Sequence, residues 1–231
     1  MKSSLWKNAF GAIGIALAAP VMAYSVNFEG MPPGFSFPGE SVTQDNVTLT
    51  NTNGTGVVDS RDAFGPGTGL DLAPPLGTQG QFYSGLNDAE LTMTLADGAA
   101  FKILGFDFGF ISPLTSLYLP GEVPGRLKMS FDAFDGSIGN LFWSFGAADA
   151  NGLFSMIRLE GAALPSTVFT RVTFSACTFD INLDCVSPNN NFNQFALDNL
   201  NVVPEPGSLA LAALALCLVG GLRARRAEHV G

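Results

Sequence analysis

The chain of 231 residues is poor in histidine, and this shortage removes several classes of enzyme. Its only histidine is His229, close to the C-terminal end. Without histidine in the body of the chain, neither a Ser-His-Asp nor a Cys-His nucleophile can form, and a zinc site lacks its usual ligands. The glycine run at residues 65–69 is not followed by a helical pattern, so it is not a phosphate-binding loop. We therefore predict that the protein is not an enzyme.

Cations are also scarce. Residues 24–203 contain six Lys and Arg residues against eighteen Asp and Glu residues, which gives this stretch a net charge of −12. An acidic domain is a poor ligand for nucleic acid or for an anionic membrane, so neither is an expected partner. It can bind Ca²⁺, or neutral or cationic partners, although the acids are also what solubility alone requires.

Long helical patterns are missing between residues 24 and 203. Instead, short runs alternate between apolar and polar residues, as in Phe106, Phe108 and Phe110, and the 27 Gly and 14 Pro residues predict many turns. Asp135 and Gly136 predict a hairpin turn, whereas residues 54–80 have few periodic apolar residues and predict a long loop. The expected strands cover residues 25–28, 47–52, 89–95, 101–110, 126–134, 139–145, 154–159, 167–176 and 192–202. Such a set predicts one all-β domain over residues 24–202, an antiparallel two-sheet sandwich of the jelly-roll type.

The N-terminus has the three parts of a secretory signal peptide. Lys2 and Lys7 form its basic region, and residues 9–19 form an apolar run that is too short to span a bilayer. Val21 and Ala23 place small residues at the −3 and −1 positions of a cleavage site. We expect residues 1–23 to be removed by cleavage after Ala23, which would export the rest of the chain.

The C-terminus also has three parts in a fixed order. A proline-rich motif comes first, residues 208–222 follow without a charge, and a basic cluster ends the pattern. Arginines after an apolar segment act as a stop signal and stay in the cytoplasm. The motif consists of Pro204, Glu205 and Pro206, and the basic cluster of Arg223, Arg225 and Arg226.

This order resembles the PEP-CTERM sorting signal of bacteria that make exopolysaccharide. The resemblance covers residues 203–226, and residues 227–231 would be a cytoplasmic tail. Gln194, Phe195 and Asp198 are similar to the Gln-Phe-x-x-Asp motif of one PEP-CTERM subgroup. The resemblance implies a membrane exosortase as partner. It also implies a transient anchor in the inner membrane through a short C-terminal helix, followed by transfer to the cell surface or the extracellular matrix.

Three cysteines are present, and their positions in the chain predict different roles. Cys217 lies in the apolar tail and would be discarded with it. Cys177 and Cys185 would remain in an oxidising compartment, where a close pair predicts a disulfide that closes a small loop.

Both ends of the expected domain carry acidic motifs, with Phe28-Glu29-Gly30 at the start and Asp198-Asn199 at the close. This pair resembles the edges of bacterial carbohydrate-binding jelly rolls and related adhesion domains. The resemblance implies a structural Ca²⁺ held by Glu29, Asp198 and Asn199, because Ca²⁺ takes six to eight oxygen ligands. Further oxygens would come from Asp45, Asp59 or Asp62. The alternative is that Glu29 and Asp198 only bond to turn amides at strand ends.

Tyrosine and tryptophan are few, and these are the rings that usually stack on sugars. Trp143 shares a face with Leu141 and Phe145 by alternation, so we expect it in the core. Tyr83 and Tyr118 occur in loop-like segments and are the candidates for an exposed glycan contact.

These observations leave three hypotheses for the exported domain. The first is a non-enzymatic structural or adhesive role in the exopolysaccharide or biofilm matrix. The second is a carbohydrate-binding module with a specific glycan ligand. The third is a secreted polysaccharide hydrolase that uses two carboxylates, because eighteen acids offer many pairs.

Overall fold

The computed structural model describes residues 22–114, 118–186 and 192–205, and this part of the chain is all-β. Two single turns of 3-10 helix, η1 (Arg61–Ala63) and η2 (Gly161–Ala163), interrupt the strands. The strands are β1 (Tyr24–Val26), β2 (Gly34–Ser36), β3 (Ser41–Gln44), β4 (Val47–Ser60), β5 (Leu72–Ala73), β6 (Gln81–Leu95), β7 (Phe101–Phe110), β8 (Ser112–Pro113), β9 (Gly125–Ala133), β10 (Ile138–Ser144), β11 (Ile157–Glu160), β12 (Phe169–Phe179), β13 (Cys185–Val186) and β14 (Phe195–Pro204).

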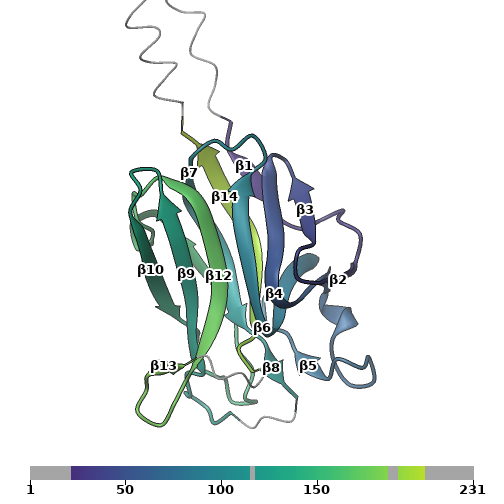
Figure 1. The fold of residues 1–231 in the computed structure, drawn as a ribbon. Helices are drawn as coiled ribbons and strands as arrows, with labels where there is room; N and C mark the ends of the chain where they lie inside the picture. The colour runs from purple at the N-terminus through teal and green to yellow at the C-terminus, as the bar shows by residue number, and fades with distance from the viewer. Residues whose placement is uncertain (1–21, 115–117, 187–191, 206–231) are drawn as a thin grey trace, which may run out of the picture.

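The strands form two antiparallel layers (Figure 1). The first layer has the order β3, β4, β6, β12, β9, β10. The second has the order β2, β4, β6, β14, β7, β11, and β1 pairs with the C-terminal part of β14. This is the predicted two-sheet, jelly-roll-like sandwich.

Strands β4 and β6 belong to both layers because they bend at the same point. Their register shifts between Asn51 and Thr55. Opposite this shift, Asn87 and Asp88 of β6 have positive φ angles of 56° and 59°. Gly54 is required here, because a Cβ at this position would lie 2.5 Å from the Asn87 carbonyl oxygen. The first half of β4 and the second half of β6 therefore lie in one sheet, and their other halves lie in the other.

The prediction of a loop over residues 54–80 is wrong at its start, since β4 continues to Ser60. The remainder contains η1 and β5 and packs on the second sheet through Phe64 and Leu72, which form a small cluster with Phe82. Phe64 and Phe82 stack with ring centroids 5.6 Å apart. This segment therefore covers an outer face of the sandwich, although it has little regular structure.

Phenylalanine rings fill the space between the sheets, as the composition predicts. Phe106, Phe108 and Phe110 of β7 are completely buried. Phe106 meets Phe174 of β12 with ring centroids 5.3 Å apart and Trp143 of β10 at 5.7 Å. Trp143 is only partly buried but packs against this core, which confirms the prediction for its face. Inward phenylalanines leave Asp107 pointing to the outer side of β7, where a polar site forms.

The termini of the sandwich lie next to the two predicted targeting segments. β14 runs to Pro204, and Glu205 is held by an ion pair with Lys102 and by a backbone bond to the Ala100 carbonyl. Most of the predicted signal peptide, the C-terminal helix and the arginine cluster lie outside the described residues. Among the residues that are described, no helix is long and apolar enough to cross a membrane.

Candidate functional site

An acidic cavity of about 310 Å³ lies where β1, β7 and β14 meet. Asp198 of β14 pairs in register with Asp107 of β7, and Glu29 follows β1 on the neighbouring side. The cavity is lined by Asn27, Glu29, Gly77, Thr78, Gln79, Asp107, Met156, Asp198 and Asn199. Three carboxyl groups from distant parts of the chain therefore face one small space.

A bulge in β14 positions the acids. The register with β7 shifts between Asp198 and Asn201, and Asn199 has a positive φ of 49°. Its amide N–H donates to Asp198 Oδ1 at 2.7 Å, and its side-chain Nδ2 donates to Asp107 Oδ2 at 2.7 Å. Asn199 thus holds the side chains of both aspartates in place. Residues with a positive φ in β-bulges are often found at functional sites.

The cavity is electrostatically unfavourable for its own acids. Burial, and after it the charges of Asp107 and Glu29, raise the pKa of Asp198 to about 7 against the opposing effects of the Asn199 amide and Arg158. Asp198 is buried, with only 5% of its surface exposed to solvent. Arg158 is the nearby counter-charge, with Nη1 3.3 Å from Asp107 Oδ1. A second cation in the cavity would relieve the remaining repulsion.

The predicted calcium ligands Glu29, Asp198 and Asn199 all line this cavity, whereas Asp45, Asp59 and Asp62 do not. Asp107 is a lining acid that the sequence did not reveal. Across the described residues, no group of three or more Asp, Glu, His or Cys side chains is close enough to hold a metal ion. A Ca²⁺ site here would therefore need amide and carbonyl oxygens beside the carboxylates, a mixture that Ca²⁺ accepts.

A second polar feature crosses the outer face of the first sheet. One residue from each of six neighbouring strands stands in register, and all six have short hydroxyl or amide side chains. We call this set the polar row: Ser41, Thr50, Thr92, Thr173, Ser130 and Asn140. Five inter-strand steps of about 4.8 Å each carry it across about 24 Å of the sheet.

Hydrogen bonds between neighbours order the polar row. Thr92 Oγ1 lies 2.9 Å from Thr173 Oγ1, and the Ser130 hydroxyl donates to Asn140 Oδ1 at 2.7 Å. A groove of about 520 Å³ on this face is lined by four members of the row, from Thr92 to Asn140, and an ion pair between Arg171 and Asp132 forms part of its wall. The face therefore presents fixed donors and acceptors along a channel.

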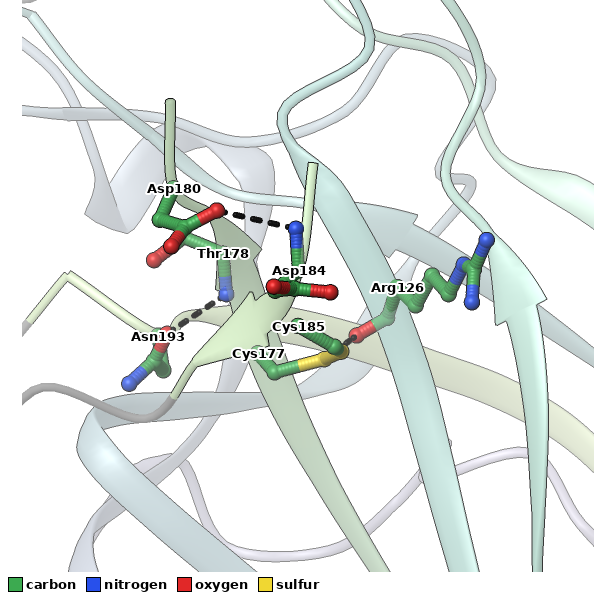
Figure 2. The surroundings of a disulfide bond; sticks show 7 residues. All are labelled: Arg126, Cys177, Thr178, Asp180, Asp184, Cys185 and Asn193. Atoms are coloured by element: carbon green, nitrogen blue, oxygen red, sulfur yellow. Dashed lines mark hydrogen bonds between the residues drawn. A yellow bond between two sulfur atoms is a disulfide. The ribbon is translucent and has the colours of Figure 1, made fainter. Parts of the chain in front are cut away.

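A third hollow, the disulfide-end groove, has a volume of about 720 Å³. The disulfide between Cys177 and Cys185 confirms the predicted pair and ties β13 to the end of β12 (Figure 2). Phe179, two residues after Cys177, lines the groove. The Arg126 guanidinium lies 5.2 Å from the centroid of the Phe179 ring. The groove is lined by Tyr118, Glu122, Val123, Pro124, Arg126, Ser144, Thr178, Phe179, Asp180 and Leu183.

The two tyrosines predicted as glycan contacts have different outcomes. Tyr83 lies in β6 and is 2% exposed, with Phe28 and Phe195 each 6.1 Å away by ring centroid, so the prediction for Tyr83 is wrong. Burial raises the pKa of its hydroxyl above the ordinary value. Tyr118 is partly buried, with its ring edge-on to Phe154 at 5.0 Å. Tyr118 lines the disulfide-end groove, and its contact with a glycan stays a prediction.

No protein-family profile matches the chain, and no curated protein matches its sequence. Several solved structures share its shape at low sequence identity. A DUF4465 family protein from Bacteroides caccae has 9% identity and a TM-score of 0.47, over 80% of this chain and 100% of its own. The CBM22-1 xylan-binding domain from Paenibacillus barcinonensis Xyn10C has 10% identity and a TM-score of 0.32, over 79% and 94%. TmCBM61, solved with β-1,4-galactotriose, has 9% identity and a TM-score of 0.30, over 78% and 94%. These likenesses add no residue to the sites above.

Proposed function

We propose that the chain is a non-catalytic glycan-binding sandwich that works in an extracellular polysaccharide matrix. The observation that supports it is the polar row, four of whose six short polar side chains line a groove. A polysaccharide presents hydroxyl groups at a regular repeat, and a ladder of fixed hydroxyl and amide groups is complementary to such an array. The row crosses the strands, so a chain several sugars long would lie across the sheet.

The row is already ordered before any ligand binds. Its side chains are short and hydrogen-bonded in pairs, so little side-chain entropy is lost on binding. Phe142 and Ile138 project from the same face of β10, on either side of Asn140, and Phe142 is 45% exposed. They offer apolar contact to the C–H faces of sugar rings, as aromatic side chains do at wet interfaces.

Replacing the central threonines should weaken binding without unfolding the protein. Thr92→Val with Thr173→Val removes both hydroxyls of a mutually bonded pair while keeping the β-branched shape, so the fold should tolerate the change. A neutral hydrogen bond contributes about 0.5–1.5 kcal/mol, so with two hydroxyl groups lost we expect the Kd for the host exopolysaccharide to rise about tenfold or more. Calorimetric titration measures it.

The matched control is Thr43→Val with Thr48→Val, a second hydroxyl pair 3.1 Å apart on the β3–β4 edge that does not line the groove. It should keep the wild-type Kd. An unchanged Kd in the Thr92 and Thr173 variant would place the glycan elsewhere. Failure of the wild-type chain to bind any polysaccharide saturably would refute the proposed function.

We also propose that the acidic cavity holds a structural Ca²⁺. Asp198 with either Glu29 or Asp107 would supply carboxylate oxygens, and Asn27 and Asn199 are the amide side chains that line the same space. Bound Ca²⁺ would supply positive charge that offsets the repulsion acting on Asp198. Because these residues come from β1, β7, β14 and their loops, the ion would tie the first and last strands together and stabilise the sandwich.

Sorting by an exosortase is the third part of the proposal. The ion pair of Glu205 with Lys102 holds Glu205, directly after the end of β14 at Pro204, against the sandwich. Mass spectrometry of the exported protein should find Tyr24 as the first residue and a new C-terminus near residues 204–207. Exported protein that still ends in Gly231 would contradict processing of the tail.

A further inference from the structure

Two cations on β9 differ from the others in this acidic domain. Arg126 and Lys128 have no carboxylate within ion-pair distance among residues 22–114, 118–186 and 192–205. The remaining cations of the domain are engaged, with Arg61 bonded to the Pro75 carbonyl, Lys102 paired with Glu205, Arg158 with Asp107, and Arg171 with Asp132. In a domain with three times as many acids as cations, two cations whose charged groups have neither a carboxylate nor a hydrogen-bond acceptor among these residues need another explanation.

Arg126 lies in the disulfide-end groove, where its guanidinium packs over the Phe179 ring. Stacking on an aromatic face orients a guanidinium and leaves its edge of N–H donors available. In Figure 2 the Arg126 side chain extends away from the disulfide, and its backbone carbonyl oxygen lies 3.6 Å from Cys177 Sγ. The pairing of Arg126 in β9 with Cys177 in β12 fixes the backbone at the base of this side chain.

The acids that share the groove are used by its own loops. Asp180 Oδ1 accepts bonds from the backbone N–H groups of Asn182 at 2.8 Å and Asp184 at 2.9 Å. Glu122 Oε2 accepts from the Leu119 N–H at 2.9 Å. These carboxylates accept hydrogen bonds from the loops at the groove walls, and Arg126 is the cation among the residues that line the groove.

Arg126, Lys128 and Ser130 follow one another on the same outer face of β9, at steps of about 7 Å. Ser130 belongs to the polar row, and Arg126 lines the disulfide-end groove. A polysaccharide that crosses the sheet on the row can therefore reach Arg126 where a branch or a bend of the glycan runs along β9 from Ser130. The planar fork of a guanidinium matches the two oxygens of a carboxylate.

We infer that the glycan is acidic, and that Arg126 in the disulfide-end groove binds the carboxylate of a uronic acid residue. This inference rests on the proposed glycan-binding function and names its ligand class. The net charge of −12 does not prevent it, because charges beyond about 8 Å are largely screened at physiological ionic strength.

The test compares polygalacturonate, polyglucuronate and hyaluronate with their carboxyl-reduced forms, in which each carboxylate has become a primary alcohol. The purified full chain is titrated with each polymer by calorimetry. At least one uronate polymer should bind tenfold or more tightly than its reduced form, since a charge-assisted pair is stronger than a neutral bond. Arg126→Gln should remove this difference and leave the affinity for the reduced polymer unchanged.

Two further variants make the result specific. Arg126→Lys keeps the charge and should retain part of the discrimination, which separates a charge effect from misfolding. Arg61→Gln removes a cation outside both grooves and should behave as wild type. Equal binding of the uronate and reduced polymers by the wild-type chain, or discrimination that survives Arg126→Gln, overturns the inference and leaves the proposed function standing. If neither form binds to wild type or to any variant, the inference is overturned, and the proposed function is refuted as well if the host exopolysaccharide also fails to bind.

Discussion

Chelation of calcium should lower the melting temperature of the purified chain by about 5–10 °C. Calcium at one hundred times its Kd stabilises a folded protein by about 2.7 kcal/mol. For a chain of this size, each kcal/mol shifts the melting temperature by about 2–4 °C. The shift should be read by differential scanning calorimetry, with Ca²⁺ and with EDTA.

Asp198→Asn gives the sharper form of this prediction because its effect changes sign with calcium. In EDTA the variant should melt above wild type, since burial and the nearby acids raise the pKa of Asp198 to about 7 and make its ionised form costly. Each unit of raised pKa corresponds to about 1.4 kcal/mol of cost above that pH. With calcium, the variant should lose the stabilisation that wild type gains, because it lacks a ligand carboxylate.

Asp59→Asn is the matched control, since Asp59 lies in β4 and does not line the acidic cavity. It should respond to calcium as wild type does. The control for metal removal is elemental analysis of the EDTA-treated protein. If that protein is metal-free and still melts at the same temperature as the calcium-loaded protein, the calcium proposal is ruled out. The glycan proposal would be unaffected, because the polar row lies on the other sheet.

Removal of the disulfide should lower the stability of the protein by about as much as removal of calcium. Cys177 and Cys185 are eight residues apart, and closing so short a loop stabilises a protein by about 2–3 kcal/mol on the chain-entropy account. Cys177→Ser with Cys185→Ser should therefore lower the melting temperature by about 5–10 °C in calorimetry. The same change should weaken uronate discrimination, because Asp180 and Leu183 of the released loop line the disulfide-end groove.

Wild-type protein under reducing conditions should match the serine variant, and the variant itself should not respond to reductant. This pair of measurements separates loss of the bond from loss of the sulfur atoms. Equal melting temperatures for oxidised and reduced wild type would show that the bond contributes nothing to stability. Uronate discrimination that survives its loss would show that the groove does not depend on the bond.

Strands with strong alternation were predictable from the sequence. The expected strand over residues 101–110 matches β7 (Phe101–Phe110), because phenylalanines facing the core alternate with small or polar residues. The long bent strands were predicted only in part, since Gly54 was expected in a loop, and Asn87 and Asp88 lie just before the expected strand over residues 89–95. Their positive φ angles occur inside strands here, because the bend lets β4 and β6 pass between sheets.

Only those residues of the acidic cavity that lie near the two ends of the domain were predictable from the sequence. Motifs at the first and last strands indicated Glu29, Asp198 and Asn199, but Asp107 could be placed there only once the register of β7 with β14 was known. The polar row has the same origin, because its members are spread from Ser41 to Thr173 and meet only through strand pairing.

The error at Tyr83 has a packing cause. Its hydroxyl end lies against Gly56, where an added Cβ would come within 2.8 Å of the oxygen. A glycine on the neighbouring strand therefore makes room for a buried tyrosine. Gly56 lies in the stretch that was expected to be a loop, so this pairing could not be foreseen.

The most direct test of the account is NMR mapping of the polysaccharide on the assigned chain. Titration with the host exopolysaccharide should shift the signals of Thr92, Ser130 and Thr173 first, and those of Arg126 with an acidic polymer. Shifts confined to the acidic cavity around Asp198, or to the β2–β4 edge of the second sheet, would contradict a glycan site on the polar row.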